Sequence, residues 1–276
     1  MNLEKFSIKG EVVIITGGGG LLGRRHAEAV AEIGGIPVLL DIDDQKAASA
    51  ADKIRKSFGA DCESYQADIT REQELVDILA KLSVRFGKVP SGLINNAAID
   101  PKFDNEANKV PKSRLEAFPL EQWNREVAVG LTGAFLCAKV FGSEMAKQGK
   151  GVIINISSDL GIISPDQRLY RKEGIPDNMQ PVKPVTYSVI KHGLMGLTKY
   201  LATYWAKNGV RCNALAPGGV YNNHPKEFVD KISQLIPLGR MADKNEYKAA
   251  IQFLISDASS YMTGATIVMD GGRSTW

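Results

Sequence analysis

The chain has 276 residues, of which 44% are hydrophobic and 24% are charged, and its formal net charge is +3. These values are typical of a soluble globular protein, and the small net charge argues against nucleic acid or an anionic membrane as a partner. No apolar run is long enough for a transmembrane helix, and residues 1–10 lack the apolar core of a signal peptide, so we expect a cytoplasmic protein without a membrane anchor.

Cysteine and histidine usage gives no indication of a disulfide or a metal site. Cys62, Cys137 and Cys212 are isolated along the chain and odd in number, which favours reduced thiols. The three histidines show no metal-ligand spacing, so we expect no bound metal.

Short β-branched runs alternate with segments of helical period along the whole chain. Strands are predicted at residues 11–16, 36–41, 64–67, 91–95, 151–157, 210–216 and 265–269. Helices are predicted at residues 21–33, 43–58, 70–86, 120–147, 185–208, 227–235 and 244–256, with Thr70 at the start of the third. This alternation predicts a Rossmann-like, doubly wound α/β fold, in which about seven parallel strands carry helices on both faces. No composition shift marks a second domain, so residues 1–276 are expected to form one domain.

Two polar, proline-containing stretches interrupt this pattern, at residues 100–119 and 164–184. Solvated surface loops are the plainer interpretation, and a wall or lid of a substrate pocket is the more specific one. Their basic residues could meet a phosphate or a carboxylate, although acidic residues are nearly as frequent. The basic residues are Lys102, Lys109, Lys112 and Arg114 in the first stretch and Arg168, Arg171, Lys172 and Lys183 in the second.

A glycine-rich turn follows the first predicted strand. The run Gly18-Gly19-Gly20-Leu21-Leu22-Gly23 matches G-x-G-x-x-G. Between a strand and a helix, this spacing lets a pyrophosphate approach the backbone at a helix N-terminus, where a Cβ atom would be in the way. A turn without a ligand is the alternative, but the strand–turn–helix context favours dinucleotide binding.

Asp41 ends the second predicted strand, 18 residues after Gly23. A carboxylate at this place can accept hydrogen bonds from the ribose hydroxyls of an adenosine and repels a 2′-phosphate, so NAD is favoured over NADP. Arg24 and Arg25 give the main argument for NADP, although solvated surface residues are the simpler interpretation.

Tyr187 and Lys191 are four residues apart in a predicted helix, so their side chains share one face. A free phenol is a poor base at neutral pH, and a neighbouring ammonium lowers its pKa. The pair is therefore a candidate for acid/base catalysis. A spacing of this kind also arises by chance, so its weight depends on the rest of the chain.

Two serines, Ser157 and Ser158, end the fifth predicted strand. Strand ends of a parallel sheet meet at one edge, where ligands bind, and the glycine-rich turn, Asp41 and the serines all fall there. A phenol, an ammonium and a hydroxyl beside a nicotinamide indicate hydride transfer at a carbinol or ketone. The tyrosine would move the proton and the serine would hold the substrate oxygen.

The order of these motifs resembles the short-chain dehydrogenase/reductase family over essentially the whole chain. The matching residues are Thr16-Gly17-Gly18-Gly19-Gly20-Leu21-Leu22-Gly23, Asp41, Asp68-Ile69, Asn95-Asn96-Ala97-Ala98, Asn155-Ile156-Ser157-Ser158, Tyr187 with Lys191, Asn213-Ala214-Leu215-Ala216-Pro217-Gly218 and Asp270-Gly271-Gly272. The resemblance implies a Rossmann fold, a nicotinamide cofactor and dimers or tetramers formed through the helices at residues 120–147 and 185–208.

The resemblance also implies roles for individual residues. Ser158, rather than Ser157, matches the catalytic serine, because Gly161 follows it at the family spacing; Tyr187 and Lys191 complete the catalytic set. The expected cofactor-binding residues are Gly17, Gly19, Gly20, Leu21, Leu22, Gly23, Asp41, Ile42, Asp68, Ile69, Asn95, Ala97, Tyr187, Lys191, Pro217, Gly218 and Val220.

Four features depart from the family pattern. Leu21 replaces the middle glycine of the turn, Gly130 stands where a catalytic asparagine is usual, and Asn222 stands where a threonine usually binds the nicotinamide carboxamide. Glycine can kink a helix and keeps its carbonyl, so a proton relay through that carbonyl can survive. The fourth is the spacing of 29 positions between Ser158 and Tyr187, about twice the usual number.

The sequence therefore predicts an NAD-dependent oxidoreductase that interconverts a secondary alcohol and a ketone. A small molecule is the expected partner, and a looser similarity to proteins of surface-glycan or flagellin modification suggests a sugar or sugar phosphate. A catalytically impaired nucleotide-binding sensor or scaffold is the first alternative, motivated by Gly130 and Leu21. An NADPH-dependent acyl ketoreductase is the second, and Asp41 speaks against it.

Overall fold

The computed structural model describes residues 3–99 and 110–276. Seven parallel strands form one sheet in the order β3-β2-β1-β4-β5-β6-β7. They are β1 (Val12–Thr16), β2 (Ile36–Asp41), β3 (Glu63–Gln66), β4 (Gly92–Asn95), β5 (Gly151–Ile156), β6 (Val210–Pro217) and β7 (Thr266–Met269). The predicted doubly wound α/β fold is confirmed, and its strand order reverses between β1 and β4, where such sheets bind ligands.

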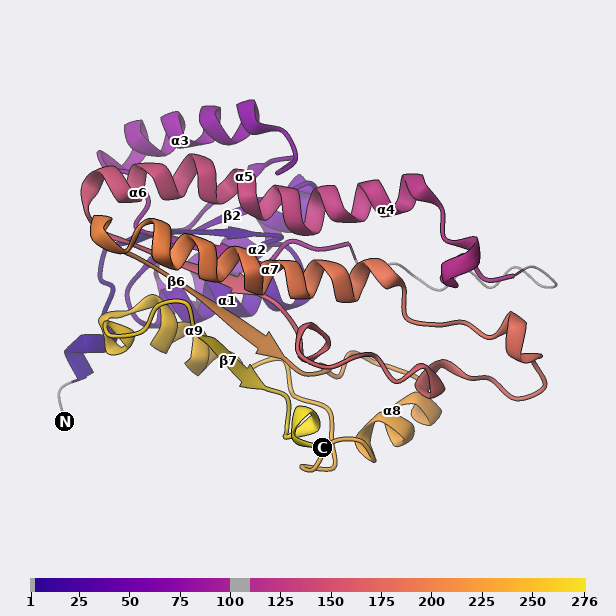
Figure 1. The fold of residues 1–276 in the computed structure, drawn as a ribbon. Helices are drawn as coiled ribbons and strands as arrows, with labels where there is room; N and C mark the ends of the chain where they lie inside the picture. The colour runs from indigo at the N-terminus through magenta and orange to yellow at the C-terminus, as the bar shows by residue number, and fades with distance from the viewer. Residues whose placement is uncertain (1–2, 100–109) are drawn as a thin grey trace.

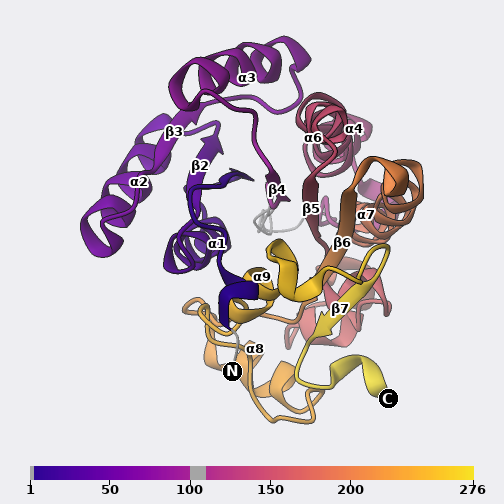
Figure 2. The same cartoon turned by 90° about the vertical axis from the view of Figure 1, so that its left-hand side faces the viewer.

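Two groups of helices cover the two faces of the sheet (Figure 2). On one face lie α1 (Leu21–Glu32), α2 (Asp44–Phe58) and α9 (Lys248–Ile255). On the other lie α3 (Glu72–Phe86), the long helix at residues 120–148 and α7 (Val185–Tyr204). Strand β1 shows why both layers form, because Val13 and Ile15 pack into the first face and Val12 and Ile14 into the second, all four buried.

The long helix is not regular along its length. It consists of α4 (Leu120–Val127), α5 (Gly133–Cys137) and α6 (Ser143–Gln148), joined by π-helical turns at Ala128–Thr132 and Ala138–Gly142. By length and hydropathy alone it could cross a membrane, but half of its most apolar window is buried in the protein. It is therefore a core helix of the α/β fold, lying beside α7 and α3 (Figure 1).

Two helix starts differ from the prediction by more than one residue. Helix α3 begins at Glu72 rather than at Thr70, because the Thr70 hydroxyl donates to Asp68 Oδ1 (2.6 Å) instead of capping the helix. Helix α9 begins at Lys248 rather than at residue 244, because the preceding residues form turns around Asp243. Side chains of the Asx type compete with helix starts through such local hydrogen bonds.

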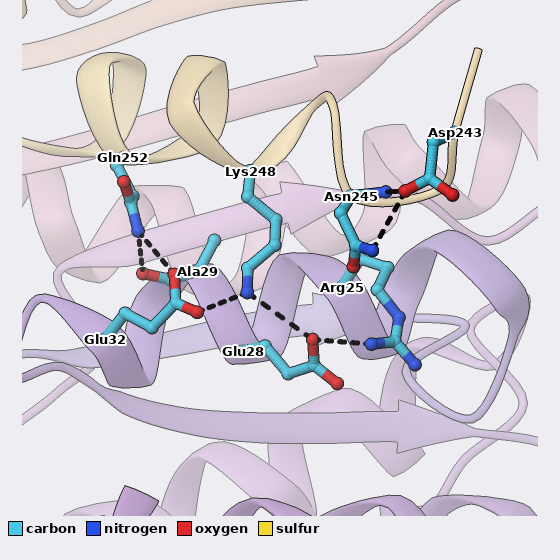
Figure 3. A network of polar contacts seen from close by, with 8 residues as sticks. All are labelled: Arg25, Glu28, Ala29, Glu32, Asp243, Asn245, Lys248 and Gln252. Atoms are coloured by element: carbon cyan, nitrogen blue, oxygen red, sulfur yellow. Dashed lines mark hydrogen bonds and ion pairs between the residues drawn. The ribbon is translucent and has the colours of Figure 1, made fainter.

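Helix α9 is fixed onto α1 by a chain of polar contacts (Figure 3). Lys248 lies between Glu28 and Glu32, and Gln252 Nε2 donates to Glu32 Oε2 (2.8 Å) and to the Ala29 carbonyl (3.3 Å). These contacts hold α1, whose N-terminus follows the glycine-rich turn, in a defined position on the sheet.

The second irregular stretch lies beyond the C-terminal ends of the strands, in contact with α8 (Lys226–Ser233; Figure 1). The described part of the first, residues 110–119, is tied to the second by Arg114. Its Nη1 donates to the carbonyls of Asp177 (3.0 Å) and Gln180 (3.4 Å). The buried Gln180 side chain holds the second stretch internally, through Lys172 N, Lys172 O and Ile175 O.

Candidate active site

A cleft of about 790 Å³ lies at the C-terminal edge of the sheet. It brings together most of the residues that the sequence singles out. Those lining it are Gly17, Gly20, Leu21, Leu22, Asp41, Ile42, Asp68, Ile69, Ala97, Ser158, Tyr187, Lys191, Pro217, Gly218 and Val220. Gly19, Gly23 and Asn95 are the expected site residues that do not line it, and the structure gives each of them a supporting place instead.

The glycine-rich turn is closed by backbone contacts that leave no space for side chains. Gly17 has a positive φ of 63°, and its carbonyl accepts from Gly20 N (3.0 Å). A Cβ atom on Gly23 would lie 2.1 Å from the same carbonyl oxygen. Gly20 is the N-cap of α1 and provides no side-chain cap, so the first backbone N–H groups of α1 are not capped by it. This open helix N-terminus fits the pyrophosphate of a dinucleotide.

Asp41 is anchored at the turn rather than free in solvent. Its Oδ2 accepts from Gly19 N (2.9 Å) and its Oδ1 from Asp43 N (3.0 Å). Gly19 therefore acts by holding Asp41, which itself lines the cleft. The carboxylate is therefore held in a fixed position at the wall of the cleft.

The two arginines after the turn have separate partners. Arg24 Nε donates to the Gly19 carbonyl (2.8 Å), and Arg25 Nη1 pairs with Glu28 (2.8 Å) on α1. Neither lines the cleft. Lys46 does line it, and it pairs with Asp43 (2.8 Å).

The ends of β1, β3 and β4 form the rest of this half. Burial alone would raise the pKa of Asp68, but hydrogen bonds from the Thr70 hydroxyl and backbone N–H outweigh it and lower the pKa, which keeps the carboxylate ionised. Thr16 Oγ1 accepts from the backbone N–H of Asn96 and of Ala97, each at 3.0 Å, and so holds β4 to the turn. Asn95 is buried and donates to Asn155 Oδ1 (2.9 Å), which links β4 to β5 inside the sheet.

Tyr187 and Lys191 lie one turn apart on α7, and both line the cleft. Lys191 is only 7% exposed, and its Nζ donates to the Ile156 carbonyl (2.9 Å) at the end of β5. Its Nζ lies 5.7 Å from the centre of the Tyr187 ring, and Lys183 Nζ lies 3.9 Å from the same centre. The ring thus has two ammonium groups beside it, of which the sequence predicts only one.

The two serines have different partners. Ser157 Oγ donates to the Lys191 carbonyl (2.8 Å) and so ties β5 to α7. Ser158 Oγ donates to Asp159 Oδ1 (2.7 Å) and accepts from Leu160 N (3.2 Å). Both serines line the cleft, so Ser158 stays a predicted catalytic residue, while the Ser157 hydroxyl joins β5 to α7.

Gly130 lies in the first π-helical turn, against α7. A Cβ atom there would lie 2.7 Å from Ile190 Cγ2, so Ile190 occupies the space that an asparagine side chain would need. Asn222 does not line the cleft, and its backbone N–H donates to His224 Nδ1 (3.2 Å).

Several residues on the substrate side carry no recognisable sequence pattern. Tyr170, Phe228 and His224 line the cleft as a row of rings, with centres 6.1 Å apart for Tyr170 and Phe228 and 5.4 Å apart for His224 and Phe228. Asp159 and Arg273 also line it. Of these residues, Asp159 is the one that the sequence could have indicated as a site residue, because it directly follows Ser158.

Most of the basic residues in the described parts of the irregular stretches, residues 110–119 and 164–184, do not line the cleft. Arg168 pairs with Asp166 (2.7 Å) and Arg171 with Asp177 (2.6 Å), both at the surface. Within residues 164–184, Lys183 is the one basic residue that lines the cleft, and Tyr170 lines it as well. Lys102 and Lys109 lie outside the described residues. Among residues 3–99 and 110–276, no group of three or more His, Cys, Asp or Glu side chains could hold a metal ion.

Comparison with known proteins assigns the family. Residues 11–170 match the family model described as short chain dehydrogenase. The chain belongs to the short-chain dehydrogenase/reductase family. Residues 177–274 match the model described as enoyl-(acyl carrier protein) reductase. The protein is accordingly an oxidoreductase of this family with a Rossmann-type nucleotide-binding fold, acting on CH–OH groups.

Similar proteins differ in cofactor and substrate. A probable NADP-dependent mannitol dehydrogenase of Yarrowia lipolytica is 32% identical, over 98% of this chain and 90% of its own. An NAD-dependent glycerol dehydrogenase of Listeria innocua is 29% identical, over 98% and 96%. The crystal structure of a gluconate 5-dehydrogenase from Burkholderia cenocepacia, in complex with NADP and tartrate, has a TM-score of 0.84 at 27% identity and covers both chains completely. These relatives act on polyols and a sugar acid and give no support for a place in glycan or flagellin modification.

Proposed function

We propose that the protein is an NAD-dependent dehydrogenase that interconverts a secondary alcohol and a ketone, with a polyol or a related sugar as substrate. One observation carries the proposal: Ser158, Tyr187 and Lys191 line the same cleft as the glycine-rich turn and Asp41. A nicotinamide dinucleotide, when bound, supplies the hydride acceptor or donor. The substrate side of the cleft is the wall of rings around Phe228, a surface suited to the apolar face of a sugar carbon chain.

The proposed roles follow from the contacts of each side chain. Tyr187 moves the proton of the substrate hydroxyl, and the nearby ammonium of Lys191 favours the phenolate form. The Ile156 carbonyl fixes Lys191 in place. Ser158 donates a hydrogen bond to the substrate oxygen, on which negative charge develops. The turn at Gly17–Gly23, with Ile42, Asp68, Ile69 and Ala97, holds the adenosine and pyrophosphate half, and Pro217, Gly218 and Val220 flank the nicotinamide.

NAD is the proposed cofactor because Asp41 is fixed at the turn. Its carboxylate accepts hydrogen bonds from Gly19 N and Asp43 N, which hold it in place. It would therefore stay close to the 2′-phosphate of NADP and repel it. Neither Arg24 nor Arg25 lines the cleft as a phosphate partner. Relatives with either cofactor exist, so the proposal rests on this geometry.

A substrate screen tests the proposal directly. Glycerol, xylitol, mannitol and gluconate are each offered with NAD⁺ and with NADP⁺, and reduction is followed by nicotinamide absorbance. We expect turnover of at least one polyol and a preference for NAD⁺ that Asp41→Ala reduces about tenfold or more. Tyr187→Phe should abolish turnover and leave NADH binding nearly intact. Near-normal turnover in that variant, or tighter NADPH than NADH binding in the parent, would contradict the assignment.

A catalytically impaired sensor is the competing function. It rests on Gly130, but the packing of Ile190 against Gly130 gives that residue a local structural reason. Robust turnover of any substrate in the screen excludes it. An acyl ketoreductase would prefer NADPH and an acyl thioester to the polyols.

A homo-oligomer is also proposed. The helices at the expected interface carry exposed aromatic side chains, Phe135 on α5 and Tyr200 and Tyr204 on α7. Exposed aromatic groups of this kind are common in subunit interfaces. Sedimentation of the purified protein gives the assembly size, and a monomer at micromolar concentration would contradict this part.

A further inference from the structure

The hydroxyl of Ser158 is bound by a buried ion pair that the roles above do not use. Ser158 Oγ donates to Asp159 Oδ1 (2.7 Å), and Asp159 Oδ2 accepts from Arg273 Nη1 (2.8 Å). Asp159 is 2% exposed and Arg273 is 6% exposed, and all three residues line the cleft. A charged pair therefore lies within hydrogen-bonding distance of the candidate catalytic serine.

The direction of the Ser158 bond follows from the chemistry of its partners. A carboxylate paired with a guanidinium has no proton to give, so the single hydroxyl proton of Ser158 points at Asp159. Leu160 N donates to Ser158 Oγ from another side (3.2 Å). Ser158 must therefore turn its proton away from Asp159 before it can donate to a substrate oxygen.

Asp159 keeps hydrogen bonds when Ser158 turns away. Leu160 N also donates to Asp159 Oδ1 (2.8 Å), and Arg273 continues to donate to Oδ2. No carboxylate oxygen is then left unpaired, so the turn does not leave an uncompensated buried charge. The hydroxyl thus has a resting position toward Asp159 and a working position toward the substrate.

Arg273 is held firmly in the position that this arrangement needs. It follows Gly272, which has a positive φ of 89°, and Asp270 accepts from Gly272 N (2.9 Å) and Ser274 N (2.8 Å). Trp276 Nε1 donates to the Leu235 carbonyl (3.2 Å), which joins this segment to the region after α8.

We propose that Asp159 restrains the Ser158 hydroxyl and that Arg273 sets the strength of the restraint; the inference rests on the proposed role of Ser158. The Asp159 carboxylate competes for the hydroxyl proton with the charge that develops on the substrate oxygen. The guanidinium weakens that competition, because it draws the charge of Asp159 toward itself. Asp159 and Arg273 are thus positioning residues with opposite effects on the rate, although they belong to one ion pair.

The test compares Asp159→Asn with Arg273→Gln on the best polyol of the screen and on its ketone. In Asp159→Asn, Arg273 still needs an acceptor and selects the amide oxygen, so the amide NH₂ faces Ser158 and the hydroxyl proton of Ser158 is released toward the cleft. Leu160 N then loses Oδ1 as an acceptor and keeps Ser158 Oγ. We expect kcat/KM to rise about threefold or more. In Arg273→Gln, the uncompensated carboxylate holds the proton more strongly, and we expect kcat/KM to fall about tenfold. Because the overall equilibrium is fixed, each change should be equal in the two directions if NAD and NADH binding are unaltered.

Two further measurements separate this role from a merely structural one. In a Ser158→Ala background, both substitutions should leave the residual rate unchanged, because they act through the Ser158 hydroxyl. Arg273→Lys, which keeps the cation, should recover most of the rate that Arg273→Gln loses. If thermal unfolding shows that Asp159→Asn does not fold, the two Arg273 variants in both backgrounds carry the test.

The outcomes distinguish the two proposals. Loss of rate in both single variants, or effects that persist without Ser158, overturns the restraint while the proposed function stands. Absence of turnover in the parent protein overturns the proposed function and the restraint with it. Opposite effects that disappear in the Ser158→Ala background support the restraint.

Discussion

The two halves of the cleft are held in shape by different means. On the cofactor side, backbone meets backbone, as where Gly23 packs on the Gly17 carbonyl, and the strand ends come directly from the buried sheet. On the substrate side, irregular segments are held by single side chains, such as Gln180 and Arg114 bonded to carbonyls. We expect that most substitutions in the first half disturb the fold, whereas the residues of the second half can be replaced without disturbing it. This difference suits a family whose members act on different substrates.

Gly23→Ala breaks the cofactor half and has the largest expected effect. The new Cβ atom would lie 2.1 Å from the Gly17 oxygen, so the turn or the start of α1 must move. We expect loss of NADH binding and a fall of about 4 kcal/mol or more in the free energy of unfolding. Calorimetry measures the unfolding free energy, and NADH fluorescence measures the binding.

Gly196→Ala is the matched control on α7, where nothing lies within 4 Å of the new atom. This variant should bind NADH normally, and its free energy of unfolding should rise by about 0.5–1 kcal/mol. Normal NADH binding by Gly23→Ala would refute the backbone account.

Gly130→Asn tests the boundary between the halves. Its Cβ atom would lie 2.7 Å from Ile190 Cγ2, so overpacking should cost about 1–3 kcal/mol of unfolding free energy and should not create activity. Ile190→Ala removes the obstacle but leaves a cavity when introduced alone. Denaturant unfolding of the two single variants and the double variant gives the coupling. We expect the double variant to lose clearly less than the sum of the singles, and strictly additive losses would show that the two side chains do not compete for this space.

Gln180→Ala acts on the substrate half alone and has the smallest expected effect on stability. It removes the hydrogen bonds to Lys172 N, Lys172 O and Ile175 O that hold residues 172–180 together. We expect KM for the polyol to rise about threefold to tenfold, because a loosened loop must be ordered on binding. NADH affinity and the melting temperature should change little. The control is Gln73→Ala on α3, where the side chain donates to the exposed Asp77 Oδ1; equal KM changes in both variants would contradict a role for the loop.

The pattern of apolar and polar residues along the chain was sufficient to predict most strands and helices of the fold. The five central strands β1, β2, β4, β5 and β6 are short, largely apolar and mostly buried runs, whereas the edge strands β3 and β7 are only partly buried. The errors occur where polar side chains make local hydrogen bonds, as Thr70 does with Asp68 before α3. The π-helical turns of the long helix were also beyond prediction, because apolar periodicity does not distinguish them from regular helical turns.

The sequence by itself determined the sheet, the dinucleotide turn and the spacing of Tyr187 and Lys191, because each depends on neighbours along the chain or on a fixed helical or strand period. Only the tertiary structure decided that the Ser157 hydroxyl donates to the Lys191 carbonyl, why Gly130 fits, and that Arg273 reaches Asp159 from 114 positions away. Those contacts join segments that are distant in sequence, and no periodicity records them. The physical reason is that packing against a distant side chain is fixed by the folded arrangement as a whole.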